Sequence, residues 1–182
     1  MGLDSIQILV DIEECFDITI EDNEAERIRT VGELSDHVWS LVETKSEKVC
    51  FNQLIYFRLR KFVTSNSTIS PMKFSPTLKI SKIWDKKRRQ EVWEDISKEL
   101  ELKIPKFTGW FLANRDQVFA NDTIQELSEK IVVQNLDKLR SEFGLSRNNV
   151  NSIVISIIKD ISGVDRKEIV PDATFTNDLG IN

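Results

Sequence analysis

Two pairs of similar segments constrain the fold of this chain more than any other feature. TVGELSDHV at Thr30–Val38 matches TIQELSEKI at Thr123–Ile131 almost residue for residue. ILVDIEECFDITI at Ile8–Ile20 has the same apolar pattern as VWEDISKELELKI at Val92–Ile104. Internal similarity of this kind predicts repeated structural units. We therefore expect two units of the same fold in one chain.

A third pair of similar segments changes the order of the parts. The loop MKFSPTLKI at Met72–Ile80 resembles EIVPDATFTNDL at Glu168–Leu179. In the middle of the chain this loop precedes the segments Val92–Ile104 and Thr123–Ile131. The C-terminal loop instead follows the similar segments Ile8–Ile20 and Thr30–Val38. Residues 48–140 therefore form one complete unit, and residues 1–47 and 141–182 are the two parts of another. The chain ends on FTNDLGIN, whose continuation we place at MGLDSIQI.

The two terminal parts can meet in more than one way. They can close within one chain, as a circular permutation that leaves a monomer. They can also pair between chains, as a swapped dimer or a head-to-tail filament. The N-terminal helices alone would leave their apolar stripes open, which makes docking of some kind favourable. We favour closure within one chain.

Helical periodicity dominates all of these segments, and we predict an all-α fold of two small bundles. Asp4 is a suitable N-cap for a helix from Ser5 to about Phe16. Thr30 and Thr123 are suitable caps for two further helices. Only six glycines and four prolines occur in 182 residues, which disfavours a turn-rich β fold. The apolar stripes expected in the cores include Ile8, Ile12, Phe16, Leu34, Val38, Leu59, Trp93, Ile96, Leu127, Ile153, Val154, Ile157, Ile158 and Ile161.

Charge is divided along the chain in the same places. Residues 1–47 hold thirteen acidic and three basic residues, and residues 48–140 hold eleven acidic and eighteen basic residues. Residues 141–182 hold six acidic and four basic residues. Such asymmetry indicates segments with different roles. We predict domain boundaries after residues 47 and 140.

Composition excludes several classes of protein. No apolar stretch reaches membrane-spanning length, and the N-terminus lacks the features of a signal peptide. Cys15 and Cys50 lack metal-ligand spacing and suggest reduced thiols, so we expect a cytoplasmic protein with no bound metal. The basic residues show no nucleic-acid signature, and the net charge is −5. No nucleophile is paired with a base, which argues against an enzyme.

Joined end to beginning, the terminal segments resemble an acyl carrier protein. The resemblance lies in GVDRKEIVPDATFTNDLG followed by GLDSIQILVDIEECFDITIEDNEAERIRTVGELSDHV, about residues 149–182 and 1–44. It implies that Ser5, preceded by Asp4, carries 4'-phosphopantetheine as a phosphodiester and holds acyl groups on the terminal thiol. A separate phosphopantetheinyl transferase would attach the group, and the partners would be acyl-handling enzymes of fatty acid or polyketide biosynthesis. The start of a helix also suits a phosphate on physical grounds.

Both units also offer charged surfaces for partners. The acidic residues expected to dock basic enzyme patches are Asp11, Glu13, Glu14, Glu21, Asp22 and Glu24. The middle unit has Arg89 where the other unit has Ser5, so it lacks the attachment hydroxyl. Its basic residues Lys86, Lys87, Arg88 and Arg89 suit either a structural spacer or a surface that binds the acidic segment or an acidic partner.

Two alternatives remain open at the level of the sequence. Asp-Ser at a helix start is often only capping chemistry, and an acidic run is often only a solvated face. The chain can then be a non-carrying interaction or scaffold module with a carrier-like fold. In addition, the divided unit has one short stretch that either Leu179–Asn182 or Gly2–Asp4 can occupy, but the two segments cannot occupy it together.

Overall fold

The chain divides into two compact units. A computed structural model describes residues 2–42, 49–84, 89–107 and 117–181. Unit 1 comprises residues 1–48 and 140–182, and unit 2 comprises residues 49–139. Eight α-helices occur within the described ranges. One of these, α7 (Leu136–Phe143), contains the boundary between residues 139 and 140.

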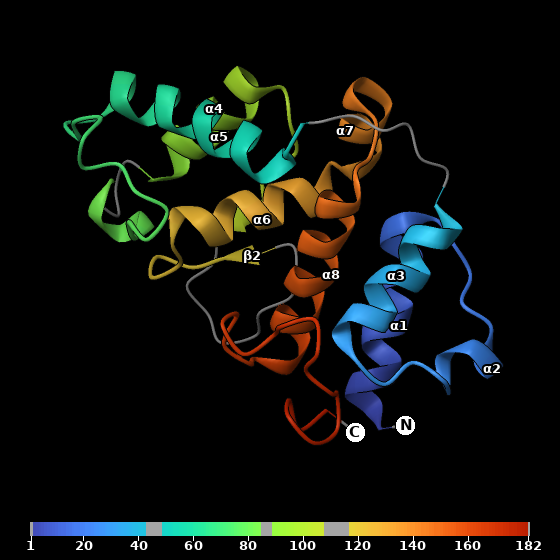
Figure 1. The fold of residues 1–182 in the computed structure, drawn as a ribbon. Coiled ribbons are helices and arrows are strands. Elements are labelled where there is room, and N and C mark those ends of the chain that lie inside the picture. The colour runs from blue at the N-terminus through green and yellow to red at the C-terminus, as the bar shows by residue number, and fades with distance from the viewer. Residues whose placement is uncertain (1, 43–48, 85–88, 108–116, 182) are drawn as a thin grey trace. The chain divides into compact units, whose positions relative to one another are not determined.

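Unit 1 is built from both ends of the chain. Its helices are α1 (Leu3–Phe16), α2 (Asp22–Ala25), α3 (Val31–Leu41) and α8 (Arg147–Ser162). The last helix, α8, packs against both α1 and α3 (Figure 1). The predicted contact between the N-terminal and C-terminal helices is therefore confirmed.

The core of unit 1 is formed by the predicted apolar stripes. Ile153, Val154, Ile157 and Ile158 on α8 are all buried, and Ile161 at the end of the stripe is half-buried. They share the unit with buried residues of α1 and α3, namely Ile8, Ile12, Phe16, Val31, Leu34 and Val38. Burying each large aliphatic side chain is worth roughly 1.5–3 kcal/mol. The C-terminal helix thus supplies much of the apolar surface that the N-terminal helices need.

Unit 2 has an equivalent helical arrangement from a continuous segment. Its long helices are α4 (Phe51–Asn66), α5 (Arg89–Leu100) and α6 (Ile124–Gln134), and α4 packs against the other two. A short 3-10 helix, η1 (Ile80–Lys82), lies in the loop after α4.

The described residues depart from the all-α prediction only in one short parallel pair of strands. β1 (Lys106–Phe107) pairs with β2 (Gln117–Val118), two residues from each. The pairing is too short to form a sheet with a face of its own. The fold is therefore helical in both units.

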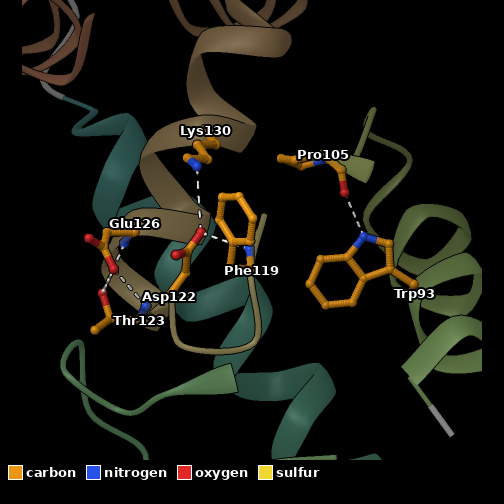
Figure 2. A network of polar contacts seen from close by, with 7 residues as sticks. All are labelled: Trp93, Pro105, Phe119, Asp122, Thr123, Glu126 and Lys130. Carbon is orange, nitrogen blue, oxygen red and sulfur yellow. Dashed lines mark hydrogen bonds and ion pairs between the residues drawn. The ribbon is translucent and has the colours of Figure 1, made fainter. Parts of the chain in front are cut away.

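Polar contacts fix the start of α6 in unit 2 (Figure 2). Asp122 accepts a hydrogen bond from the Phe119 amide at 3.0 Å and pairs with Lys130 at 3.5 Å. Thr123 then caps α6 in a reciprocal capping box with Glu126. These contacts satisfy amide groups that the helix itself leaves unpaired. The predicted cap at Thr123 is confirmed.

A second polar contact fixes the end of α5 in the same unit. The indole Nε1 of Trp93 donates to the carbonyl of Pro105 at 2.6 Å, and Trp93 is buried (Figure 2). A buried indole N–H without an acceptor would be costly. This contact therefore holds the segment after α5 against the body of the helix.

The loop of unit 1 docks on the first turn of α3 through the backbone. The amide of Val31 donates to the carbonyl of Ala173 at 3.1 Å, and the amide of Gly32 donates to the carbonyl of Pro171 at 2.8 Å. Both amides belong to the first turn, where no carbonyl of the helix itself is available. The C-terminal segment therefore completes the start of an N-terminal helix.

Unit 2 repeats this docking residue for residue. The amide of Ile124 donates to the carbonyl of Leu78 at 3.0 Å, and the amide of Gln125 donates to the carbonyl of Pro76 at 2.9 Å. In each unit the two acceptors are two residues apart, and the donors are the first two residues of the helix. The two units thus share one local structure.

Two further features are common to both units. An antiparallel bridge joins Thr30 to Thr174 in unit 1, and another joins Lys79 to Thr123 in unit 2. In addition, α1 and α5 are each followed by a residue with positive φ, Asp17 at 54° and Glu101 at 53°. The order of the parts differs: α8 and its loop come last in unit 1, whereas α4 and its loop come first in unit 2.

Two further findings concern membranes and thiols. Within the ranges described, none of the helices has both the length and the apolar composition needed to cross a bilayer. Cys15 and Cys50 are half-buried. Neither thiol forms a disulfide in its unit.

We expect Ile157→Ala to lower the free energy of unfolding of unit 1 by about 2–5 kcal/mol, because it would leave a cavity in the core. Ile157 is buried on α8. Hydrogen exchange should show lost protection in α1, α3 and α8 together. Val170→Ala, at an exposed position, is the matched control and should change stability by less than about 0.5 kcal/mol. Loss of protection in α8 alone would contradict a common core.

Candidate functional site

A cavity in unit 1 lies at the start of α1. Its volume is about 500 Å³. Four segments that are distant in the sequence contribute to its wall: the first two turns of α1, the connection after α2, α3, and the C-terminal segment. The lining residues are Gly2, Ser5, Ile8, Leu9, Ala25, Glu26, Ile28, Arg29, Leu34, Thr174, Phe175, Thr176, Asn177 and Ile181.

Ser5 lies in the first turn of α1 and lines this cavity. The helix begins at Leu3, and Gly2 is the N-cap without a side-chain hydrogen bond, so the prediction that Asp4 caps a helix beginning at Ser5 is wrong. Glycine is acceptable at this position because its backbone adopts the extended conformation freely. The hydroxyl of Ser5 donates to the carbonyl of Gly2 at 3.0 Å, and the residue is half-buried.

The electrostatic environment of Ser5 is that of a helix start. The unpaired amides of the first turn give this end a partial positive charge. Asp4 is exposed in the same turn, where a carboxylate interacts favourably with the helix dipole. Arg29 and Glu26 are the charged residues that line the cavity. The site therefore offers a hydroxyl, a helix terminus and one cation.

The C-terminal segment, rather than the N-terminal residues, fills the apolar position next to the site. Aligning Gly180 with Gly2 places Ile181 opposite Leu3. Ile181 is 2% exposed, whereas Leu3 is 87% exposed. The C-terminal copy of this short repeat therefore occupies the core, and Leu3 is left in solvent.

Two carboxylates hold the C-terminal segment and α3 in place. Asp178 accepts hydrogen bonds from the amide and the hydroxyl of Thr174 at 2.8 and 2.7 Å, and these donors lower its pKa. Glu33 accepts from the amides of Arg29 and Thr30 at 2.7 and 3.0 Å, which lowers the pKa of Glu33. Thr30 in turn caps α3, so the predicted cap at this residue is confirmed. The wall of the cavity is thus fixed on both sides.

Histidine and cysteine are absent from the described residues that line the cavity with Ser5. The single histidine of the chain, His37, lies on α3 and does not line the cavity. Among the residues that the structure describes, no cluster of His, Cys, Asp and Glu is suited to a metal ion.

Three of the predicted acidic docking residues lie on α1, and they differ from one another in burial and hydrogen bonding. Asp11 is buried and accepts a hydrogen bond from Gln7 at 2.6 Å, so it is not part of the exposed acidic surface. Glu13 is half-buried and accepts from the Ile20 amide at 2.7 Å, which ties it to the end of the helix. Glu14 is exposed.

The remaining acidic residues lie at α2. Glu21 and Asp22 are exposed, and Glu24 is half-buried and pairs with Arg27 at 3.3 Å. The predicted basic residues Lys86, Lys87 and Arg88 lie outside the described residues. Arg89 is the first residue of α5, and the position of its side chain is likewise outside the description.

Sequence reasoning missed three residues of the site. Arg29 and Ile28 line the cavity, although neither belongs to a motif. Gly32 lies where a Cβ atom would come within 2.9 Å of the Pro171 carbonyl oxygen. A glycine in the first turn of a helix was the available signal, since glycine in a helix often marks close packing.

Neither a protein-family model nor a solved structure matches this chain.

We expect Gly32→Ala to loosen the segment that begins at Pro171, because a Cβ would contact backbone and force a shift. The loss of stability should be about 1–3 kcal/mol. Hydrogen exchange should rise in residues 171–177, next to the cavity. Gln125→Ala at the corresponding position of unit 2 is the matched control, since a Cβ is already accommodated there. Unchanged exchange in Gly32→Ala would refute the close contact.

We expect Glu33→Gln to weaken unit 1 at neutral pH. The amides of Arg29 and Thr30 hold the pKa of Glu33 below its ordinary value of 4.5. The charged form therefore stabilises the fold above this value, and the contribution is lost as the pH falls through the folded pKa. Urea unfolding across this range should show wild type and variant converging at low pH. Glu94→Gln, at an exposed carboxylate of α5, should show no such convergence.

Proposed function

We propose that this chain is an acyl carrier protein that holds acyl thioesters on a 4'-phosphopantetheine arm attached to Ser5. Unit 1 is the carrier bundle, assembled from the N-terminal and C-terminal segments. Unit 2 is a diverged bundle of the same type that lacks the attachment hydroxyl. The chain itself is not an enzyme in this proposal, and its partners are a phosphopantetheinyl transferase and acyl-handling biosynthetic enzymes.

The observation that carries this proposal is the position of Ser5. It lies in the first turn of a 14-residue helix and lines a cavity of about 500 Å³. A phosphodiester on its oxygen would meet the positive end of the helix. Arg29 on the wall of the same cavity can balance the added negative charge.

In this proposal a separate transferase supplies the base for the attachment. A transferase removes the proton of the Ser5 hydroxyl while the oxygen attacks the phosphorus of the pyrophosphate in coenzyme A. The new P–O bond joins the arm to Ser5, and the adenosine bisphosphate portion leaves. The contribution of unit 1 is to present the hydroxyl at an ordered helix start.

The cavity also suits the arm or its cargo. Its apolar wall includes Ile8, Leu9, Ile28 and Leu34, while Thr174–Asn177 supply polar groups along one edge. Apolar lining with a few polar groups is typical of small-molecule sites. An acyl chain or part of the arm attached to Ser5 would therefore find a partly apolar cavity beside it.

The shared architecture of the two units supports the carrier assignment indirectly. The same loop-to-helix hydrogen bonds occur at Val31 and Gly32 in unit 1 and at Ile124 and Gln125 in unit 2. They agree with the repeat on which the sequence resemblance depends. The divided unit is thus a permuted relative of the continuous one, and the resemblance to a carrier spans its two parts in the order α8, loop, α1, α2, α3.

We expect the purified full chain to gain the mass of one phosphopantetheinyl group when incubated with coenzyme A and a broad-specificity transferase. Ser5→Ala should abolish the gain without loss of helicity by circular dichroism. Ser40→Ala, at an exposed serine of α3, should be modified like the wild type. Intact-mass spectrometry measures all three proteins.

Failure to modify the wild type with several transferases would count against the carrier assignment. If protein from the native host also lacks the group, the chain is a non-carrying interaction or scaffold module. A mass gain that persists in Ser5→Ala would instead show that the wrong hydroxyl has been assigned.

A further inference from the structure

One stretch of unit 2 carries only positive charge. Residues 49–84 contain six basic residues and no acidic residue. The opposite holds in unit 1, where residues 2–26 contain nine acidic residues and no basic residue. The stretch in unit 1 comprises α1, α2 and the connection between them, and the stretch in unit 2 comprises α4, the loop after it and η1. Each stretch therefore contributes charge of one sign to its own unit.

The basic stretch also exposes large apolar side chains. Phe57 on α4 is 56% exposed, and Met72 in the following loop is 96% exposed. Lys61, one turn after Phe57, and Lys73, next to Met72, are exposed as well. Among the described residues, neither lysine has an acidic partner. Large exposed apolar side chains beside cations are a feature of binding surfaces.

The helix and the loop are held together as one surface. Arg60 on α4 donates to the carbonyl of Pro71 at 3.2 Å. Tyr56 donates to the carbonyl of Phe74 at 3.1 Å, and its ring packs edge-on against Phe57 with centroids 5.4 Å apart. We call the set Phe57, Arg60, Lys61, Met72 and Lys73 the basic–apolar surface.

The outer face of α1 in unit 1 has the complementary composition. Leu3, Ile6 and Val10 are 87%, 49% and 39% exposed, and their spacing places them on one side of the helix. Glu14 and Asp17 are exposed and continue the same side toward the end of the helix. We call this set the acidic–apolar surface. Its apolar residues lie near Ser5, and its carboxylates lie further along.

We propose that the basic–apolar surface of one chain binds the acidic–apolar surface of a second copy of the same chain. Each surface combines exposed apolar side chains with charges of one sign, and the two signs are opposite. Such pairing steers association and fixes the register of the bound helix. Phe57 and Met72 supply the apolar anchors for Leu3, Ile6 and Val10. All five side chains are exposed on their own units.

Self-association through these surfaces has a consequence for Ser5. Ile6 follows Ser5 directly on α1, so a partner bound to the acidic–apolar surface would cover the approach to the hydroxyl. The dimer would therefore restrict access of other proteins to this helix. The proposal itself does not depend on Ser5 being modified, because both surfaces belong to the unmodified chain.

Sedimentation velocity on the unmodified full chain tests the proposal. We expect concentration-dependent dimers or larger species at low ionic strength, weakened at least about tenfold in moderate salt. Lys61→Glu with Lys73→Glu should reduce association to a similar degree. Lys98→Glu with Lys103→Glu, the same change of charge at exposed lysines elsewhere in unit 2, should not. Circular dichroism confirms that each variant is folded.

Mixing complementary variants distinguishes binding between chains from binding within one chain. Val10→Lys with Glu14→Lys alters the acidic–apolar surface and should also abolish self-association. An equimolar mixture of this variant with Lys61→Glu, Lys73→Glu should associate again, because each partner keeps one intact surface. Phe57→Ala should weaken the wild-type complex without changing its salt dependence.

Three results would overturn the proposal. The wild type can remain monomeric at low ionic strength, or the matched control can lose association as completely as the test variant. The mixture of complementary variants can also fail to associate, which would indicate that any contact lies within one chain. Loss of phosphopantetheinylation in Ser5→Ala bears on the carrier assignment and leaves these outcomes unchanged.

Discussion

The amide groups at the start of α3 have no carbonyl acceptor within their own helix, and the fold of unit 1 depends on where they find one. Thr30 and Glu33 satisfy part of this requirement locally through the capping box. The carbonyls of Ala173 and Pro171 satisfy the rest, across more than a hundred residues of sequence. Unpaired buried amides are costly, so this helix start requires the C-terminal segment. Unit 2 meets the same requirement with a loop from its own continuous segment.

This requirement also explains how the candidate site is built. The segment that docks on α3 continues to Thr174–Asn177, which form one wall of the cavity beside Ser5. Asp178 binds back to Thr174, and Ile181 enters the core, so the segment is fixed at both ends. A hydroxyl from the first helix thus lies against a wall from the last residues described. The site exists only because both ends of the chain share one unit.

The two units share a helical arrangement but differ in the charge of their surface residues. Their helices, caps and docked loops agree, yet residues 2–26 of unit 1 carry only acidic charges and residues 49–84 of unit 2 only basic ones. Surface charge contributes little to a fold of this kind, whereas buried apolar residues and satisfied amides contribute most. Two units with the same local structure can therefore differ in surface charge without a change of fold.

The sequence determined the helices, the caps at Thr30 and Thr123, and the pairing of α8 with α1 and α3, because apolar periodicity and capping residues act locally and repeat visibly. Only the tertiary structure decided which of two competing residues is buried, Ile181 or Leu3, and that Asp11 lies inside. It also decided that Gly32 receives Pro171 and that Arg29 lines the cavity. These outcomes depend on close packing between segments far apart in the sequence, which no local pattern records.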